Sequence, residues 1–421
     1  MAKVVDERVR AFHQVVETGS LEELQTALAA GADVNAPGHC GATALMVAIH
    51  AQDLDKIKLL LEIGADPELT DDFNHTALRA AVQCDFVEAV RLLLNLGVDH
   101  GYSPKYPLKQ VDYDFPWTPT PLPEEMRDFW TEEEWLQSQR ESYESIRQLG
   151  LNPTVEPMIK DVVGVEVLRL FLEAGDDLNL ASNDMKRALV GLGTAESLEC
   201  SAADYRRNKT RRFGARNPER MDNPFWRAMI KTGGSAYSAR DCFGDTDSIG
   251  AEAVWCFDRF GSSLTPLPDG RFVQIAGEHE DYYDPDFCIY NDVVIHDGRG
   301  DFEIYGYPAE VFPPTDFHSA TLVGEWIYIV GSLGYADQRC SGQTPVYRLR
   351  VDSWEIEPVA TAGEMPGWIH RHRTQWIPER NALRVTGGTL HQLDSEGESE
   401  LVENESPFEL DLRTLRWRRL T

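Results

Sequence analysis

A short acidic segment concentrates the side chains of this sequence that are best suited to chemistry or binding. Residues 277–287 read GEHEDYYDPDF and contain five carboxylates, one histidine and two tyrosines. Such a set could ligate a metal ion, transfer protons or bind a basic surface. The spacing differs from that of a calcium-binding loop, and one histidine among carboxylates does not define a metal site. Acid–base catalysis needs two carboxylates at a defined distance in space, which a loop sequence does not show.

We interpret the segment as a surface loop that binds a protein partner. Tyrosine rings provide contact area, and carboxylates pair with a basic surface. An internally bonded structural loop and a metal or catalytic site are the alternatives. The residues assigned to partner binding are Glu278, His279, Glu280, Asp281, Tyr282, Tyr283, Asp284 and Asp286.

Two histidines are the other candidate metal ligands. In GWIHRHRTQW, His370 and His372 are two residues apart, so on one strand they would face the same side. No third ligand can be assigned, and we expect no bound metal or other cofactor. The sequence also lacks the G-x-S-x-G, G-x-G-x-x-G and P-loop motifs. We therefore assign no catalytic residue and expect the protein not to be an enzyme.

The composition is strongly acidic, with 70 Asp and Glu against 40 Lys and Arg and a formal net charge of −30. This charge opposes binding to nucleic acids and anionic lipids and favours a basic partner. The seven cysteines are scattered without a C-x-x-C pair, as expected in a reducing compartment. The charged N-terminus shows no signal peptide, and no apolar run has membrane-spanning length. We therefore predict a cytoplasmic protein that binds neither nucleic acid nor membrane.

Residues 1–203 contain a helical repeat. GADVN at Gly31, GADPE at Gly64 and GVDHG at Gly97 are spaced by 33 residues, as are TALMVA and TALRAA. The segments between them carry apolar residues every three or four positions, and such short helices bury their apolar faces by stacking. This pattern resembles the ankyrin repeat, although Ala44 and Ala77 replace the proline of the family's T-P-L-H motif. The resemblance, which extends to bacterial ankyrin repeat proteins, implies a helical solenoid that recognises other proteins.

An insertion of 45 residues interrupts the solenoid. A fourth repeat, VEVLRLFLEAGDDLN, has its turn glycine at Gly175 rather than 33 residues after Gly97. The extra residues therefore lie within about 98–152, a stretch rich in proline, aromatic and acidic residues. Its tryptophans are Trp117, Trp130 and Trp135. Either these tryptophans contact a protein partner, or they pack the insertion back onto the solenoid.

Residues 204–254 form a basic connecting segment. Between residues 206 and 240, ten lysines and arginines stand against two acidic residues. We expect this segment to lie against one or both acidic halves and to neutralise their charge. The alternatives are that this segment binds an anionic ligand or that it binds nucleic acid.

Residues 255–421 contain a β-strand repeat. The segments FVQIAG, IYIVGS and LRVTGG include Gly277, Gly331 and Gly387, which are 54 and 56 residues apart. Each unit predicts two strands, a loop and two more strands. The units resemble kelch repeats, and this resemblance implies the four-stranded blades of a β-propeller. Three units are recognisable, so the domain is either an incomplete arc or a propeller with a further blade around 225–257. The predicted fold class is thus a helical ankyrin solenoid followed by an all-β kelch-like domain.

Both resemblances imply a scaffold for recognition and do not by themselves imply an activity. We expect a protein that binds one basic protein and neutralises or sequesters it, as an immunity protein does with a toxin or effector. A kelch-propeller enzyme of the lyase, mutarotase or metal-dependent kind, with a site near residues 278–286, is the alternative. A regulatory scaffold with several partners is a third hypothesis.

Overall fold

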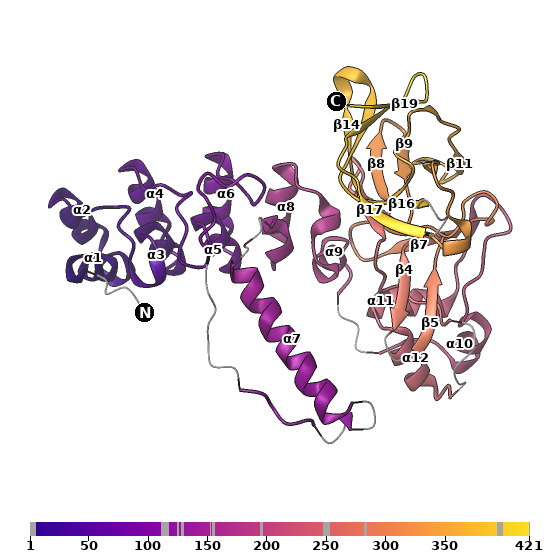
Figure 1. The fold of residues 1–421 in the computed structure, drawn as a ribbon, viewed down its shortest axis with the longest axis horizontal. Helices are drawn as coiled ribbons and strands as arrows, with labels where there is room; N and C mark the ends of the chain where they lie inside the picture. Colours follow the sequence, from indigo (N-terminus) through magenta and orange to yellow (C-terminus); the bar gives the residue numbers. More distant parts are fainter. Residues whose placement is uncertain are drawn as a thin grey trace. The chain divides into compact units, whose positions relative to one another are not determined.

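The computed structural model describes residues 6–110, 118–123, 126–127, 130–151, 153, 156–193, 197–246, 253–281, 284–393 and 399–420. The chain separates into two compact units, Met1–Met185 and Lys186–Thr421 (Figure 1). The first is helical, and the second contains all the described strands. The division at residues 203 and 254 stays a prediction. Trp117, Tyr282 and Tyr283 lie outside the described residues.

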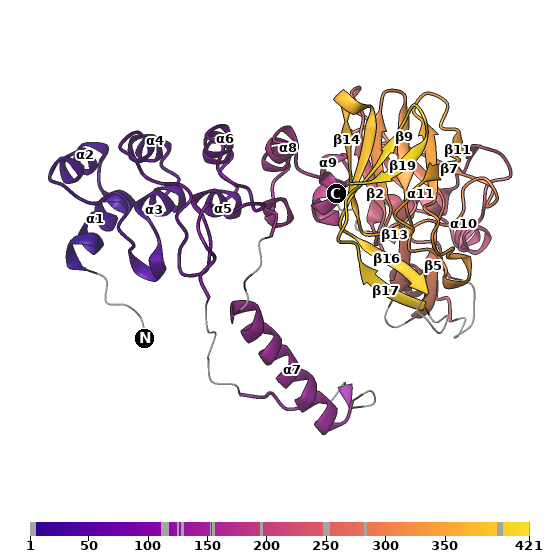
Figure 2. The ribbon, with the colours of Figure 1, turned by 45° about the horizontal axis from the view of Figure 1, so that its top comes forward.

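Three helix pairs and a short 3-10 turn, η1 (His39–Gly41), build the start of the first unit. The pairs are α1 (Glu7–Thr18) with α2 (Leu21–Ala29), α3 (Ala44–His50) with α4 (Leu54–Glu62), and α5 (Ala77–Gln83) with α6 (Val87–Asn95). Thr43 and Thr76, which begin the repeated TAL segments, are the N-caps of α3 and α5. The helices stack in two rows, α1–α3–α5 and α2–α4–α6, with apolar side chains buried between them (Figure 2).

A repeated hydrogen bond joins neighbouring repeats. The Asn35 side chain accepts a 2.9 Å bond from the backbone N–H of Asp66 and donates to the carbonyl of Gly64. One repeat later, a Glu68 carboxylate oxygen accepts a 2.8 Å bond from the backbone N–H of Asp99. The 33-residue period therefore reproduces a contact between repeats as well as the helices.

The insertion follows the third helix pair. Its described helix is α7 (Glu132–Leu151), and the solenoid then continues through η3 (Met158–Asp161), α8 (Val165–Glu173), η4 (Leu178–Leu180) and α9 (Asn183–Leu189). Helix α8 contacts α6, as the displaced fourth repeat predicts. The indole N–H of Trp135 donates a 3.0 Å bond to the carbonyl of Thr120, and Trp130 packs edge-on against Trp135. These two tryptophans thus contact the insertion itself.

Three antiparallel four-stranded meanders build the second unit. The first consists of β2 (Ser263–Pro266), β3 (Phe272–Ile275), β6 (Val293–His296) and β7 (Phe302–Gly306). The second consists of β8 (Ser319–Val323), β9 (Trp326–Val330), β10 (Val346–Arg350) and β11 (Ile356–Pro358). The third consists of β14 (Arg373–Ile377), β15 (Ala382–Thr386), β18 (Phe408–Asp411) and β19 (Arg416–Arg419), with β12 (Ala362–Gly363) parallel to β19 and η6 (Pro378–Arg380) after β14.

The connection between the second and third strand of each meander carries extra structure. In the first meander it is the hairpin β4 (Glu278–Asp281) and β5 (Asp284–Ile289). In the second it is the loop 331–345 with η5 (Ala336–Gln338). In the third it is the hairpin β16 (Thr389–Leu393) and β17 (Ser399–Glu403), beside which β13 (Trp368–His370) pairs with β16. The predicted strand–loop–strand repeat is therefore present. The described strands form no closed barrel or propeller, and the kelch assignment stays a prediction.

The second meander is buried on both faces, which explains its continuous apolar strand WIYIV. Alternate residues of β9 point to opposite faces. Ile327 and Ile329 belong to the core shared with the first meander, and Tyr328 and Val330 belong to the core shared with the third. A strand buried on both sides needs apolar residues at every position.

The basic segment packs against these sheets, as the sequence predicts. Its strand β1 (Glu219–Arg220) extends the first meander beside β7, and Arg220 forms a 2.9 Å ion pair with Glu303. Its helices are α10 (Ala202–Asn208), α11 (Pro224–Thr232) and α12 (Ala236–Phe243). Arg227 of α11 pairs with Asp301 at 2.7 Å. The segment therefore offsets acidic residues of the second unit.

Candidate functional site

The predicted acidic loop is the hairpin β4–β5. Glu278 and His279 are buried, with 9% and 5% exposure, while Glu280 is exposed. The Nδ1 atom of His279 lies 2.8 Å from the carbonyl oxygen of Asp258. Asp281 lies on β4, and Asp284 and Asp286 lie on β5. The hairpin thus has an interior part, Glu278 and His279, and an outer part that includes Glu280.

A short bridge holds the hairpin to the preceding chain. The backbone groups of Phe260 and Glu278 exchange two hydrogen bonds of 2.8 and 2.9 Å. The Phe260 side chain remains 59% exposed. The preceding residue, Arg259, is buried.

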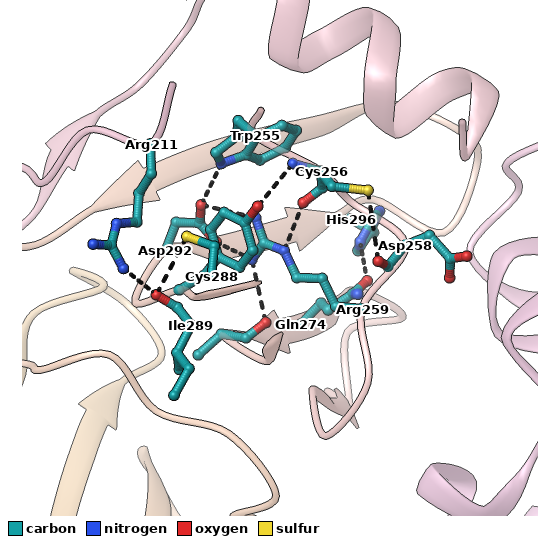
Figure 3. Close-up of polar contacts among 12 residues, drawn as sticks. Arg211, Trp255, Cys256, Asp258, Arg259, Gln274, Cys288, Ile289, Asp292 and His296 are labelled. Atoms are coloured by element: carbon teal, nitrogen blue, oxygen red, sulfur yellow. Dashed lines mark hydrogen bonds and ion pairs between the residues drawn. The ribbon is translucent and has the colours of Figure 1, made fainter. Parts of the chain in front are cut away.

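Arg259 and Asp292 form a buried ion pair (Figure 3). The Arg259 Nε donates a 2.7 Å bond to the carbonyl of Cys256, and the guanidinium lies 3.6 Å from the ring centre of Tyr290. The indole N–H of Trp255 donates a 2.8 Å bond to the second Asp292 oxygen. Because both charges are paired and bonded, this network positions the chain and does not hold a reactive group.

The thiols beside this network are poorly suited to act as nucleophiles. Burial raises the pKa of Cys256 to about 12 and also raises the pKa of Cys288. A cysteine attacks as its thiolate, so a raised pKa disfavours a nucleophilic role.

We define the buried polar cluster as three buried side chains on neighbouring segments, Glu278, Asp316 and His370, of which Asp316 acts on the charge of Glu278. Backbone bonds bring the three elements together: the N–H of Gly277 donates to Thr315 at 2.9 Å, and that of Ser332 donates to Ile369 at 3.0 Å. One Asp316 oxygen accepts bonds from the Ser332 hydroxyl and the Gly334 N–H. Within the described part of the chain, no hydrogen-bond partner reaches Glu278 Oε2, Asp316 Oδ2 or either ring nitrogen of His370.

The electrostatics of this cluster favour uncharged forms of two groups. Burial and the nearby Asp316 carboxylate raise the pKa of Glu278 to about 7. Burial and the Arg371 guanidinium lower the pKa of His370 to about 4. Near neutral pH Glu278 is therefore a carboxyl group close to its pKa, as a general acid or base requires, and His370 is a neutral imidazole. Among the residues that the structure describes, no group of three or more His, Cys, Asp or Glu could hold a metal ion.

The expectation that His370 and His372 share one strand face is wrong. Arg371 between them has a φ of 54°, so the chain turns between β13 and β14. His370 joins the buried polar cluster, whereas the Nε2 of His372 lies 2.8 Å from the Ser319 hydroxyl. This left-handed residue, which a strand pattern does not reveal, ends β13 at His370 and leaves His372 before β14, although the His370 charge still acts on His372.

Exposed apolar side chains accompany the acidic hairpins. Phe260 and Phe287 are 59% and 46% exposed beside β4–β5, and Leu401 of β17 is 53% exposed. Figure 2 shows β16, β17 and β5 at the same end of the sheets. Exposed acids, Glu280 and Glu400, lie on the same hairpins. We define the hairpin surface as Phe260, Phe287, Leu401, Glu280 and Glu400. The sequence motifs did not single out its three apolar residues.

The first unit has a similar combination at a repeat loop. Phe73 is 47% exposed and follows Asp71 and Asp72. The Asp71 carboxylate accepts 2.8 Å bonds from the backbone N–H groups of Phe73 and His75, which fixes the loop. Asp72 is exposed. We define Asp72 and Phe73 as the repeat-loop tip.

Comparison with known families agrees with the helical architecture. Residues 12–103 match the model described as ankyrin repeats (3 copies). Among curated proteins, a sequence comparison finds no match. None of the described helices is long and apolar enough to cross a membrane. Residues 12–103 are therefore ankyrin repeats, which indicate a role in protein–protein interaction.

Proposed function

We propose that this protein captures one basic protein partner through the repeat-loop tip and the hairpin surface. The observation that carries the proposal is the recurrence of exposed phenylalanine beside exposed carboxylates on both units. Aromatic side chains supply contact energy at interfaces, and the surrounding charges select the partner and speed its association.

The charge distribution supports a basic partner. Residues 1–185 hold 33 acidic and 14 basic residues, so the ankyrin unit carries most of the negative charge. In the second unit, the basic segment offsets part of the acidity through ion pairs such as Arg227–Asp301. The strongest attraction for a basic surface therefore comes from the unit whose repeats indicate protein binding.

In its specific form the proposal is neutralisation: the protein acts in the cytoplasm and sequesters a basic toxin or effector, as an immunity protein does. Sequestration requires a tight one-to-one complex with buried aromatic contacts, which Phe73 and Phe260 can provide. It also requires that binding weakens with salt, because charge pairing steers the encounter.

The test is capture of partners from the native lysate by the tagged full chain at low and moderate salt. A single stoichiometric basic protein, released by Phe73→Ala, Asp72→Lys or Glu280→Lys, would support the proposal. Leu96→Ala and Glu88→Lys are matched controls, because these exposed residues belong to helix α6 and its C-terminal end and to neither defined surface. Several substoichiometric partners would favour the scaffold hypothesis. Capture that responds equally to all five substitutions would contradict the proposed surfaces.

A second candidate function is enzymatic and rests on the buried polar cluster. Glu278 Oε2 and both ring nitrogens of His370 lack hydrogen-bond partners among the described residues, as the acid and base of a catalytic site can before substrate binds. Incubation of wild type and Glu278→Gln with a metabolite extract, followed by mass spectrometry, tests this function. Depletion of a metabolite by wild type alone would support an enzyme, and identical profiles would contradict it.

A further inference from the structure

The third meander ends the stack of sheets and carries an arginine-rich face. Leu383 and Leu410 point into the core shared with the second meander. Alternation along the strands places Arg384 and Glu409 on the opposite face. There Glu409 lies across from Arg384 on one side and Arg418 on the other. The outer face of the third meander is therefore charged. Its inner face and the faces of the second meander are apolar.

Three guanidinium groups surround one carboxylate on this face. Arg380 donates to the two Glu409 oxygens at 3.0 and 3.2 Å, and Arg384 donates at 2.7 and 3.1 Å. Arg418 also pairs with Glu409. The Glu409 side chain is 1% exposed, and these hydrogen bonds overcome the cost of burial and lower its pKa to about 2. Glu409 is therefore a permanent counter-ion that holds the arginines in place.

A fourth arginine at this face has no ion pair with any described residue. Arg416 is exposed and lies across from Asp411 in the strand register, but the Asp411 carboxylate accepts backbone bonds from Arg413 and Thr414. A hollow of about 630 Å³ opens here. Its lining includes Arg380, Glu409, Asp411, Thr414, Arg416 and Arg418. Its volume lies in the range of small-molecule sites, roughly 300–1,000 Å³.

We propose that this hollow binds a compact dianionic phosphate group. Arg380, Arg416 and Arg418 line the hollow, and Arg384 pairs with Glu409 beside it; of these four positive charges, Glu409 and Asp411 offset two. A phosphate monoester carries roughly −1.5 to −2 charge near pH 7, which balances the remainder. Each guanidinium has five N–H donors in a planar fork that fits phosphate oxygens, and the bonds to Glu409 occupy only some of them.

The surrounding charge selects a compact ligand. At physiological ionic strength, charges separated by more than roughly 8 Å are largely screened, so the arginines dominate inside the hollow. A nucleic acid or other long polyanion would extend over the rest of a chain whose formal net charge is −30. The site therefore fits a small phosphorylated molecule and opposes a polymer. Phosphate binding at this site is independent of the proposed capture of a basic partner. The site recognises negative charge, whereas the capture surfaces recognise positive charge.

Isothermal titration of the full chain with inorganic phosphate and with pyrophosphate, at constant ionic strength and pH 7.5, tests the inference. We expect saturable one-to-one binding that Arg416→Gln weakens about tenfold, as expected for loss of one charge-assisted bond. Arg416→Gln disrupts no ion pair within the described part of the chain, and an unchanged melting temperature would show that the variant folds.

The matched control is Arg299→Gln, which removes an exposed arginine from a turn of the first meander and should leave phosphate affinity unchanged. Absence of saturable binding, or equal binding by wild type and Arg416→Gln, would overturn the inference. Equal affinity for acetate would also overturn the inference, because the site would then not distinguish a dianion from a monoanion.

Discussion

The imidazole Nε2 of His318 lies 2.8 Å from the hydroxyl oxygen of Ser263, and this contact joins the first strands of two neighbouring meanders. The same contact recurs one meander later, where His372 lies 2.8 Å from Ser319. Burial lowers the pKa of both histidines to about 3, so each is neutral and can exchange one hydrogen bond with a hydroxyl. The strand repeat thus includes its own link between sheets.

A double-mutant cycle measures this link. Ser263→Ala and His318→Ala should each lower the free energy of unfolding by about 1–3 kcal/mol, because each leaves a buried polar partner. Their coupling energy in urea denaturation should be about 1 kcal/mol. The control cycle, Ser263→Ala with His372→Ala, combines residues of different links and should show no coupling. Equal coupling energies in both cycles would mean that the Ser263–His318 contact contributes nothing specific to the free energy of unfolding.

The stability of the second unit should depend on pH through Glu278. Because its pKa is about 7 in the folded protein and near 4.5 when unfolded, the folded state binds more protons between these values. The stability contributed by Glu278 is therefore lost as pH rises from 4.5 to 7. Relative to wild type, Glu278→Gln should gain roughly 1 kcal/mol of unfolding free energy between pH 4.5 and 7.5, after allowance for solvent screening.

Chemical denaturation at the two pH values checks this difference. Glu400→Gln is the control, since Glu400 is exposed on a different hairpin and is not among the groups that raise the pKa of Glu278. A pH-independent difference between wild type and Glu278→Gln would show that Glu278 does not titrate in this range.

Removal of one member of the buried Arg259–Asp292 pair should be strongly destabilising. Arg259→Met or Asp292→Ala alone leaves an uncompensated buried charge, with an expected loss of about 3–5 kcal/mol in unfolding free energy. The double variant Arg259→Met/Asp292→Leu should lose less than either single variant. The exposed pair Arg350–Asp352 provides the control, because Asp352→Ala breaks an ion pair screened by solvent and should lower the free energy of unfolding far less. Additive losses in the double variant would contradict a coupled pair.

The contact between ankyrin repeats can be tested in the first unit. Asn35→Ala removes the side chain that bonds the backbone of Asp66 and Gly64 in the next repeat. We expect a loss of about 1 kcal/mol in unfolding free energy, measured by the helical signal in circular dichroism. Asn95→Ala, at the exposed end of α6, should change stability by less than about 0.5 kcal/mol. Equal effects of the two substitutions would rule out a specific contribution from the contact.

The sequence by itself determined the repeated elements, because local patterns encode them. The TAL segments contain the N-cap threonines of two helices, and the spacing of Gly31, Gly64 and Gly97 defines the repeat that residues 12–103 match. Apolar strands and turn residues likewise indicated three β units at the observed positions. Each of these features depends on neighbours within a few residues, where periodicity and turn preferences act.

Tertiary structure alone decided which side chains meet. Arg371 adopts a left-handed conformation that directs His370 and His372 to different surroundings, and no strand pattern predicts this turn. The hairpin buries Glu278 beside Asp316, a residue 38 positions away, so their pKa values depend on a shared environment. The arginines around Glu409 gather because β15, β18 and β19 pair in register. Contacts between distant residues follow from strand pairing and burial, which local spacing does not specify.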